Sequence, residues 1–163
     1  MVTLGHERAR EACDSAMRFL PRPGTSRSLG SWTAVLHLTQ ALCLSGRREE
    51  GALLQADAEK IALEWVCGSS VPARTAAGIA AACGLNWSRA EEHHRAAIAR
   101  MDEIPDRTAQ PITRYWYADM LVERAAPGDL ESARALLSDT IAESEAIGLR
   151  LYARLARERL ARA

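Results

Sequence analysis

The chain has 163 residues, enough for one domain or one short repeat array with a sizeable buried core. Its 21 basic and 21 acidic residues cancel, so no overall field draws it to nucleic acid or to an anionic membrane. Aromatic residues make up only 5% of the chain while Ala and Leu dominate, which favours close-packed helices over a β-sandwich.

The sequence indicates a protein of a reducing compartment. Residues 1–10 are polar and contain no apolar signal-peptide core, and no apolar run approaches the length of a membrane-spanning helix. The cysteines are widely spaced and form no C-x-x-C pair, and nothing indicates the secreted context that a disulfide framework needs. We therefore expect a soluble, cytoplasmic chain with reduced, buried thiols at Cys13, Cys43, Cys67 and Cys83.

Helix-period apolar residues between Gly and Pro breakers predict seven to nine helices in antiparallel pairs. A first helix covers residues 1–20, and the Pro/Gly/Ser-rich segment that follows is the best linker candidate. Because no stretch alternates with period two, no strand is predicted. We expect one all-α domain over residues 1–163, with helix pairs over 28–66, 72–104 and 111–148 and a capping helix over 149–163.

Several predicted helix boundaries depend on single residues. Residues 47–66 are expected as one continuous helix. Pro72 is expected in the first turn of a helix that Gly84 ends, because proline lacks the N–H that this turn leaves unpaired. A later helix is predicted over residues 111–124, and Asp129 is expected to cap the helix after it.

A small residue recurs early in the second helix of each pair, at Gly51, Ala90 and Ala133. Each follows a glycine by five to six residues. The pattern resembles the tetratricopeptide repeat, in which small residues let the two helices pack closely. The intervals of 39 and 43 residues are longer than the usual repeat, which indicates degenerate repeats. We expect a short tetratricopeptide-like α-solenoid with capped ends.

A sharper resemblance covers roughly residues 72–152, and a run of motifs carries it. These are Ala90-Glu-Glu-His-His-Arg-Ala-Ala-Ile98, Thr113-Arg-Tyr-Trp-Tyr-Ala-Asp-Met-Leu121, Arg124-Ala-Ala-Pro-Gly-Asp129, Ala133-Arg-Ala-Leu-Leu137 and Ala146-Ile-Gly-Leu149. They are similar to the helical-repeat C-terminal region of bacterial ATPase-containing transcriptional regulators and nucleotide cyclases. The resemblance implies a helical module without an active site of its own. Those relatives place the region behind an ATPase and a DNA-binding or cyclase domain, and this chain contains neither.

No catalytic or metal-binding set emerges from the sequence. Glu91 and His94 have the spacing of the Glu-x-x-His motif of di-iron bundles, but that architecture needs a second such motif and two further inward carboxylates. Position 94 falls on the apolar face, where a packed histidine is the simpler interpretation. Neither a G-x-S-x-G nucleophile elbow nor a G-x-x-x-x-G-K-[ST] phosphate loop occurs. We expect no enzymatic activity, no metal and no cofactor.

The concave face of a solenoid is formed by the first helices of successive pairs. Tyr115, Trp116 and Tyr117 concentrate aromatic area there, and consecutive helical residues cannot share a face, so core packing and a binding surface both stay open for them. The arginines of the C-terminal helix either dock on an acidic partner or solubilise a capping face. We expect the Tyr115/Asp119 side to carry recognition. The candidate groove residues are Gln40, Arg74, Tyr115, Asp119 and Val122.

Three functions remain open at this point. The first is a non-catalytic module whose concave face binds a protein or peptide as part of a signalling or transcriptional regulator, without direct contact to nucleic acid or membrane. The second is a small-molecule sensor whose groove closes over a ligand, and the third is an enzyme or metal protein with an unrecognised site. A deep apolar pocket with convergent polar groups would favour the sensor, and an open shallow groove the interaction module.

Overall fold

The computed structural model describes residues 2–20, 29–64, 72–103 and 106–163. Within these ranges the chain forms nine α-helices and one short 3₁₀ helix, joined by turns and without any strand. The all-α prediction is therefore confirmed. In the same ranges, no helix combines the length and the apolar character needed to cross a bilayer.

The helices follow the predicted order along the chain. The N-terminal helix α1 (Val2–Ala16) runs into the 3₁₀ helix η1 (Met17–Phe19). The others are α2 (Leu29–Leu44), α3 (Arg48–Leu53), α4 (Gln55–Glu64), α5 (Ala73–Cys83), α6 (Trp87–Glu103), α7 (Ala109–Arg124), α8 (Asp129–Ala146) and α9 (Arg150–Leu160).

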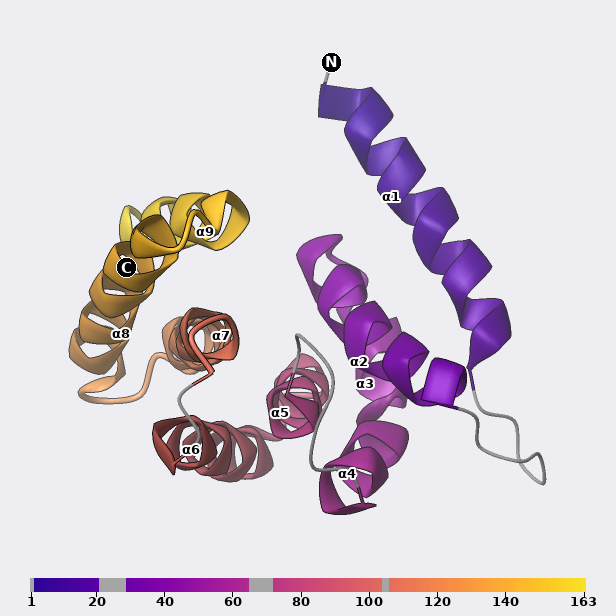
Figure 1. Ribbon diagram of the computed structural model, residues 1–163, viewed down its shortest axis with the longest axis horizontal. Coiled ribbons are helices and arrows are strands. Elements are labelled where there is room, and N and C mark those ends of the chain that lie inside the picture. The colour runs from indigo at the N-terminus through magenta and orange to yellow at the C-terminus, as the bar shows by residue number, and fades with distance from the viewer. Residues whose placement is uncertain (1, 21–28, 65–71, 104–105) are drawn as a thin grey trace.

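Successive helices pack against one another in a curved array. The closest partners are neighbours in the chain, above all α5 with α6, α7 with α8, and α8 with α9. Figure 1 shows two layers, in which α4, α6 and α8 lie on the outer side of the arc and α2, α5, α7 and α9 on its inner side. Contacts of α2 with α5, α5 with α7, and α7 with α9 join the inner helices into one layer.

Small residues allow the two layers to approach closely. Ala90 and Ala133 are both fully buried, as the repeat pattern predicts. At Gly51 of α3, an added Cβ would lie 3.1 Å from Cys83 Sγ of α5, closer than ordinary van der Waals contact. The apolar core is made of two clusters, one between α1 and the start of α5 and the other from α5 to α9.

One predicted helix is interrupted. The helix expected over residues 47–66 divides at Leu54, where α3 ends and α4 begins. The Leu54 amide donates to the carbonyl of Gly51 at 3.2 Å, an i to i−3 bond that tightens the turn. This turn buries the Leu54 side chain in the N-terminal cluster. Residues 65–66 of the predicted helix lie outside the described residues.

Capping groups outside the apolar pattern set two other boundaries. Helix α7 begins at Ala109 rather than at Pro111, because Asp106 Oδ1 accepts the amides of Thr108 and Ala109, both at 3.0 Å. Asp129 does not cap α8 from outside, since it is the first residue of the helix and Gly128, with a φ of +84°, precedes it. Its carboxylate instead accepts the Ala126 amide at 2.8 Å.

The breakers on either side of α5 are close to their predicted places. Pro72 directly precedes the helix rather than lying in its first turn, and its carbonyl accepts the Ala76 amide at 3.1 Å. Gly84 ends the helix, as predicted, but its φ of −87° is open to any residue. The left-handed conformation falls on the next residue, Leu85, with a φ of +59°.

Candidate functional site

Gln40 and Tyr115, two of the predicted groove residues, meet at Tyr152 of α9. The Tyr152 hydroxyl donates to Gln40 Oε1 at 3.0 Å and accepts from Trp116 Nε1 at 3.3 Å. The rings of Tyr115 and Tyr152 pack edge to face with centroids 5.4 Å apart. Both tyrosines are only 5% exposed, so these aromatic side chains form a buried contact between the inner helices.

Asp119, another of the predicted groove residues, also faces α9. Its Oδ1 lies 2.9 Å from Arg159 Nε, and the same guanidinium pairs with Glu123. Burial raises the pKa of the Asp119 carboxyl, and the charge of Arg159 opposes that shift. Asp119 thus already has a cationic partner within the chain. The role of Tyr115 and Asp119 in recognition stays a prediction.

Arg74 and Val122 belong to the inner layer but not to this contact. The hydroxyls of Thr75 and Thr113 lie 2.9 Å apart where α5 and α7 begin. Arg74 is next to this pair, about two turns of helix away from the level of Asp119. Val122 is half-buried against the C-terminal apolar cluster. The structure therefore gathers Gln40, Tyr115 and Asp119 beneath α9 and leaves the other two residues apart.

An open apolar groove lies between α1 and α2, where the sequence predicted only a terminal helix. Its volume is about 1060 Å³. Small side chains line it on both helices, including Ala9, Ala12 and Ala16 of α1 and Ala34 and Ala41 of α2. Phe19 and Leu44, also in its lining, are 65% and 43% exposed. Along the described residues of this lining, the ionisable side chains apart from Cys13 are His37 and Arg154.

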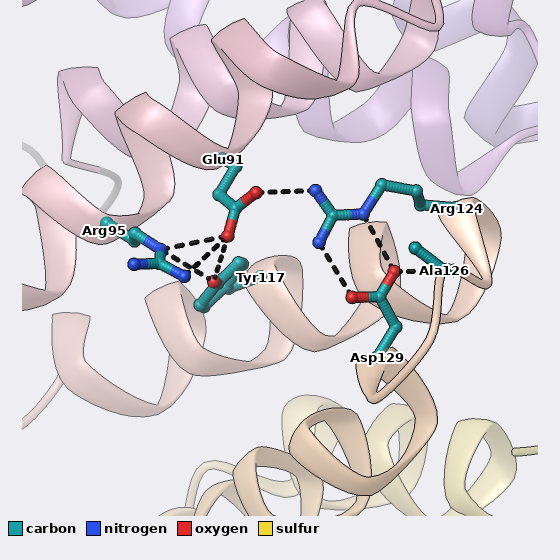
Figure 2. A network of polar contacts seen from close by, with 6 residues as sticks. All are labelled: Glu91, Arg95, Tyr117, Arg124, Ala126 and Asp129. Atoms are coloured by element: carbon teal, nitrogen blue, oxygen red, sulfur yellow. Dashed lines mark hydrogen bonds and ion pairs between the residues drawn. The ribbon is translucent and has the colours of Figure 1, made fainter.

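Glu91, one half of the possible metal motif, is the centre of an ion-pair network (Figure 2). Arg124 Nη1 lies 2.6 Å from Glu91 Oε2, and the Tyr117 hydroxyl donates to Oε1 at 3.2 Å. The hydrogen bond and charge of Arg124, with a smaller contribution from Arg95, hold the pKa of Glu91 below its ordinary value. Arg124 also holds Asp129 in a bidentate pair at 2.7 and 2.8 Å, so the network ties α6, α7 and α8 together.

His94, the other half of the motif, is fully buried. Its ring stacks on Tyr117 with centroids 5.7 Å apart, and neither ring nitrogen has a hydrogen-bond partner among the described residues. Burial lowers the pKa of His94 to about 3. Nowhere in the described part of the chain do three or more His, Cys, Asp or Glu side chains gather as a metal site would require.

Comparison of the chain with protein-family models, with curated proteins and with solved structures gives no match.

Proposed function

We propose that this chain is a non-catalytic helical-repeat module that binds an apolar segment of another protein in the groove between α1 and α2. The groove itself supports this proposal most directly. It is open, and its lining includes many small side chains from α1 and α2. A helix of another protein can lay its apolar face in such a groove and make contacts one and two turns apart.

The character of the lining favours a protein segment over a small molecule. Sites for small ligands enclose most of the ligand and aim several polar groups at it. Here the groove is open, and the Thr33 hydroxyl in its lining is already bonded to the carbonyl of Leu29. The charged group at the edge is Arg154 of α9, which is 65% exposed and lies 3.6 Å from Glu158. It suits a carboxylate at the border of a bound apolar segment.

A place in a bacterial signalling or transcriptional regulator is the wider context that we propose for this binding. The resemblance of residues 72–152 to the helical-repeat regions of such regulators supports it. In that setting the module has no chemistry of its own and acts by holding a partner segment.

A peptide selection tests the proposal directly. A displayed library of helical peptides with varied apolar faces is selected on the full chain, and the dissociation constants of the selected peptides are measured by titration calorimetry. Ala12→Trp fills the groove, and we expect it to weaken binding at least about tenfold, equivalent to about 1.4 kcal/mol. Ala135→Trp is the matched control, because Ala135 is an exposed alanine of α8 outside the groove.

The control variant should bind the selected peptides as tightly as the unmodified chain. Peptides that bind Ala12→Trp with unchanged affinity would show that the groove is not the binding site. A selection that enriches no peptide at all would count equally against the proposed function.

A further inference from the structure

The groove between α1 and α2 has a one-sided charge, although the chain as a whole is neutral with 21 basic and 21 acidic residues. Among the described residues that line the groove there is no Asp or Glu, whereas His37 of α2 and Arg154 of α9 both belong to the lining. Helix α2 itself contains no acidic residue. The groove is therefore bordered by cationic groups, with no carboxylate in its described lining to balance them.

The carboxylates of α1 lie away from the groove. The residues of this helix that line the groove share one stripe at helical spacing. At about 100° per residue, Glu7, Glu11 and Asp14 lie about 150° or more from the centre of that stripe. Asp14 Oδ1 pairs with Arg47 Nη1 at 2.7 Å instead. Arg8, in contrast, lies about 90° from the centre and so borders the stripe.

Arg154 and His37 are only weakly engaged within the chain. Arg154 Nη1 lies 3.6 Å from Glu158 Oε1, and the two side chains are 65% and 50% exposed. An exposed pair of this kind contributes little, because water screens it and both side chains lose freedom in forming it. His37 is exposed and has no hydrogen bond or ion pair among the described residues. Both groups can therefore pair with a carboxylate that enters the groove.

The rest of the lining favours a helix over other anionic partners. A nucleic acid is held through many phosphate contacts from Lys and Arg, whereas the described lining contains one arginine among mainly uncharged side chains. An anionic bilayer is a broad surface that receives the apolar face of a helix, and a groove recessed between two helices does not match it. A helix with one apolar face fits such a groove and can carry carboxylates on both sides of that face.

We propose that the groove takes an acidic amphipathic helix of a partner protein, with small apolar side chains on one face and Asp or Glu at the flanking positions. This class of partner rests on the proposed function of the groove and adds the charge of the segment that binds there. The apolar face packs against the alanines of α1 and α2, and the flanking carboxylates accept hydrogen bonds from Arg154 and His37. A segment with flanking Lys or Arg is rejected by the same border, because like charges then meet.

Three versions of one peptide test the charge preference. A helical peptide from the selection described above is remade with Glu, with Gln or with Lys at every position that flanks its apolar face. Its dissociation constant from the full chain is measured by titration calorimetry at low and at high salt. At low salt we expect the Glu version to bind at least about tenfold more tightly than the Lys version, with the Gln version between them. Added salt should narrow the difference, because exposed charges are screened.

Arg154→Glu tests the assigned cation. It should reduce the preference for the Glu version over the Lys version at least about threefold. Arg107→Glu is the matched control, because Arg107 is exposed directly before α7 and outside the groove, and it should leave the preference unchanged. Arg154→Gln removes the charge without placing a second carboxylate beside Glu158, and it should also reduce the preference. The comparison of the three peptides on the unmodified chain needs no variant to fold.

The outcomes separate this partner class from the proposed function. If Ala12→Trp weakens binding of the Gln version while the Glu version binds the unmodified chain no more tightly than the Lys version, the groove binds an apolar segment but its charge preference is wrong. A selection that enriches no peptide overturns both proposals. Vesicles of phosphatidylserine and a single-stranded oligodeoxynucleotide are titrated alongside. Tighter binding of either than of the Glu version, abolished by Arg154→Glu, would overturn the assignment of an acidic helix.

Discussion

His94 is packed as a flat apolar ring rather than as a ligand or a base. One face stacks on Tyr117, and Gly78 of α5 lies so close that an added Cβ would be 2.7 Å from the ring. Both ring nitrogens lack partners among the described residues, so a charge on the ring would have no acceptor to stabilise it. The low pKa of His94 follows from this burial, with a smaller contribution from the neighbouring charge of His93.

This histidine makes stability depend on pH. The pKa of His94 is about 3 in the folded chain, against an ordinary value of 6.5, so the unfolded chain takes up the proton first as the pH falls. We expect this effect to leave the free energy of unfolding unchanged above pH 6.5. As the pH falls from 6.5 towards 3, the free energy of unfolding should decrease by up to about 1.4 kcal/mol per pH unit. Urea unfolding followed by circular dichroism between about pH 7 and pH 5 measures this, since an unperturbed Asp or Glu titrates below that range.

The control for this pH dependence is His94→Leu, which removes the titrating group. Its free energy of unfolding should vary less with pH than that of the unmodified chain. An equal slope in both chains would mean that the proton binds elsewhere.

At the scale of helices, the sequence predicts which segments are helical better than where each one ends. Apolar spacing identifies the segments because it reflects the buried face of each helix. The boundaries depend on features that spacing does not contain. The interruption at Leu54 follows from the burial of that side chain, and the start of α7 depends on Asp106, which lies three residues ahead of the helix.

The same limit applies to the site. Gln40, Tyr115 and Asp119 belong to helices of the inner layer, but only the tertiary structure shows that α9 covers them. The groove was not predicted, because it depends on how α1 lies against α2. The spaced alanines of the two helices, at Ala9, Ala12 and Ala16 and at Ala34 and Ala41, were the available signal.

Gly78 determines how closely α5 and α6 pack. Alanine is ordinarily the better residue inside a helix, by about 1 kcal/mol. We nevertheless expect Gly78→Ala to lower the free energy of unfolding by about 1–3 kcal/mol, because its Cβ would overlap the fixed ring of His94. In a His94→Ala background the space is free, and Gly78→Ala should become neutral or stabilising.

Urea denaturation of the unmodified chain, Gly78→Ala, His94→Ala and the double variant measures the effect of Gly78→Ala on the free energy of unfolding in each background. The reversal of sign is the informative result, because it separates steric overlap from a general effect of the substitution on α5. An equal loss of stability in both backgrounds would show that the contact with His94 is not the cause.

At the scale of the whole molecule, polar contacts join parts of the array that are distant in the sequence. A simple solenoid has contacts only between adjacent repeats. Here the bond from Tyr152 to Gln40 connects α9 to α2 across 112 positions of the chain. Arg48 of α3 also lies 3.8 Å from Glu123 of α7, which is a second polar contact between distant parts of the chain. We infer that the described helices unfold together rather than repeat by repeat.

The Tyr152–Gln40 bond makes this inference testable. Tyr152→Phe keeps the ring against Tyr115 but removes the hydroxyl, which leaves Gln40 Oε1 and Trp116 Nε1 buried without their partner. A buried polar group that loses its partner costs about 1–3 kcal/mol, so Tyr152→Phe should lower the free energy of unfolding by that amount. Gln40→Leu in the Tyr152→Phe background should cost less than Gln40→Leu alone, because its hydrogen bond is already gone.

The matched control is Tyr117→Phe, which removes a hydroxyl bonded to Glu91 on the other side of α7. Its effect on stability should add to that of Gln40→Leu, since the two groups share no contact.

Urea denaturation of all the single and double variants gives both coupling energies, and its m-value reports cooperativity. If the inner layer joins the two ends of the array, Tyr152→Phe should also lower the m-value, because α2 and α9 then unfold less tightly together. Strict additivity of Tyr152→Phe with Gln40→Leu at an unchanged m-value would instead mean that neighbouring contacts alone hold the array.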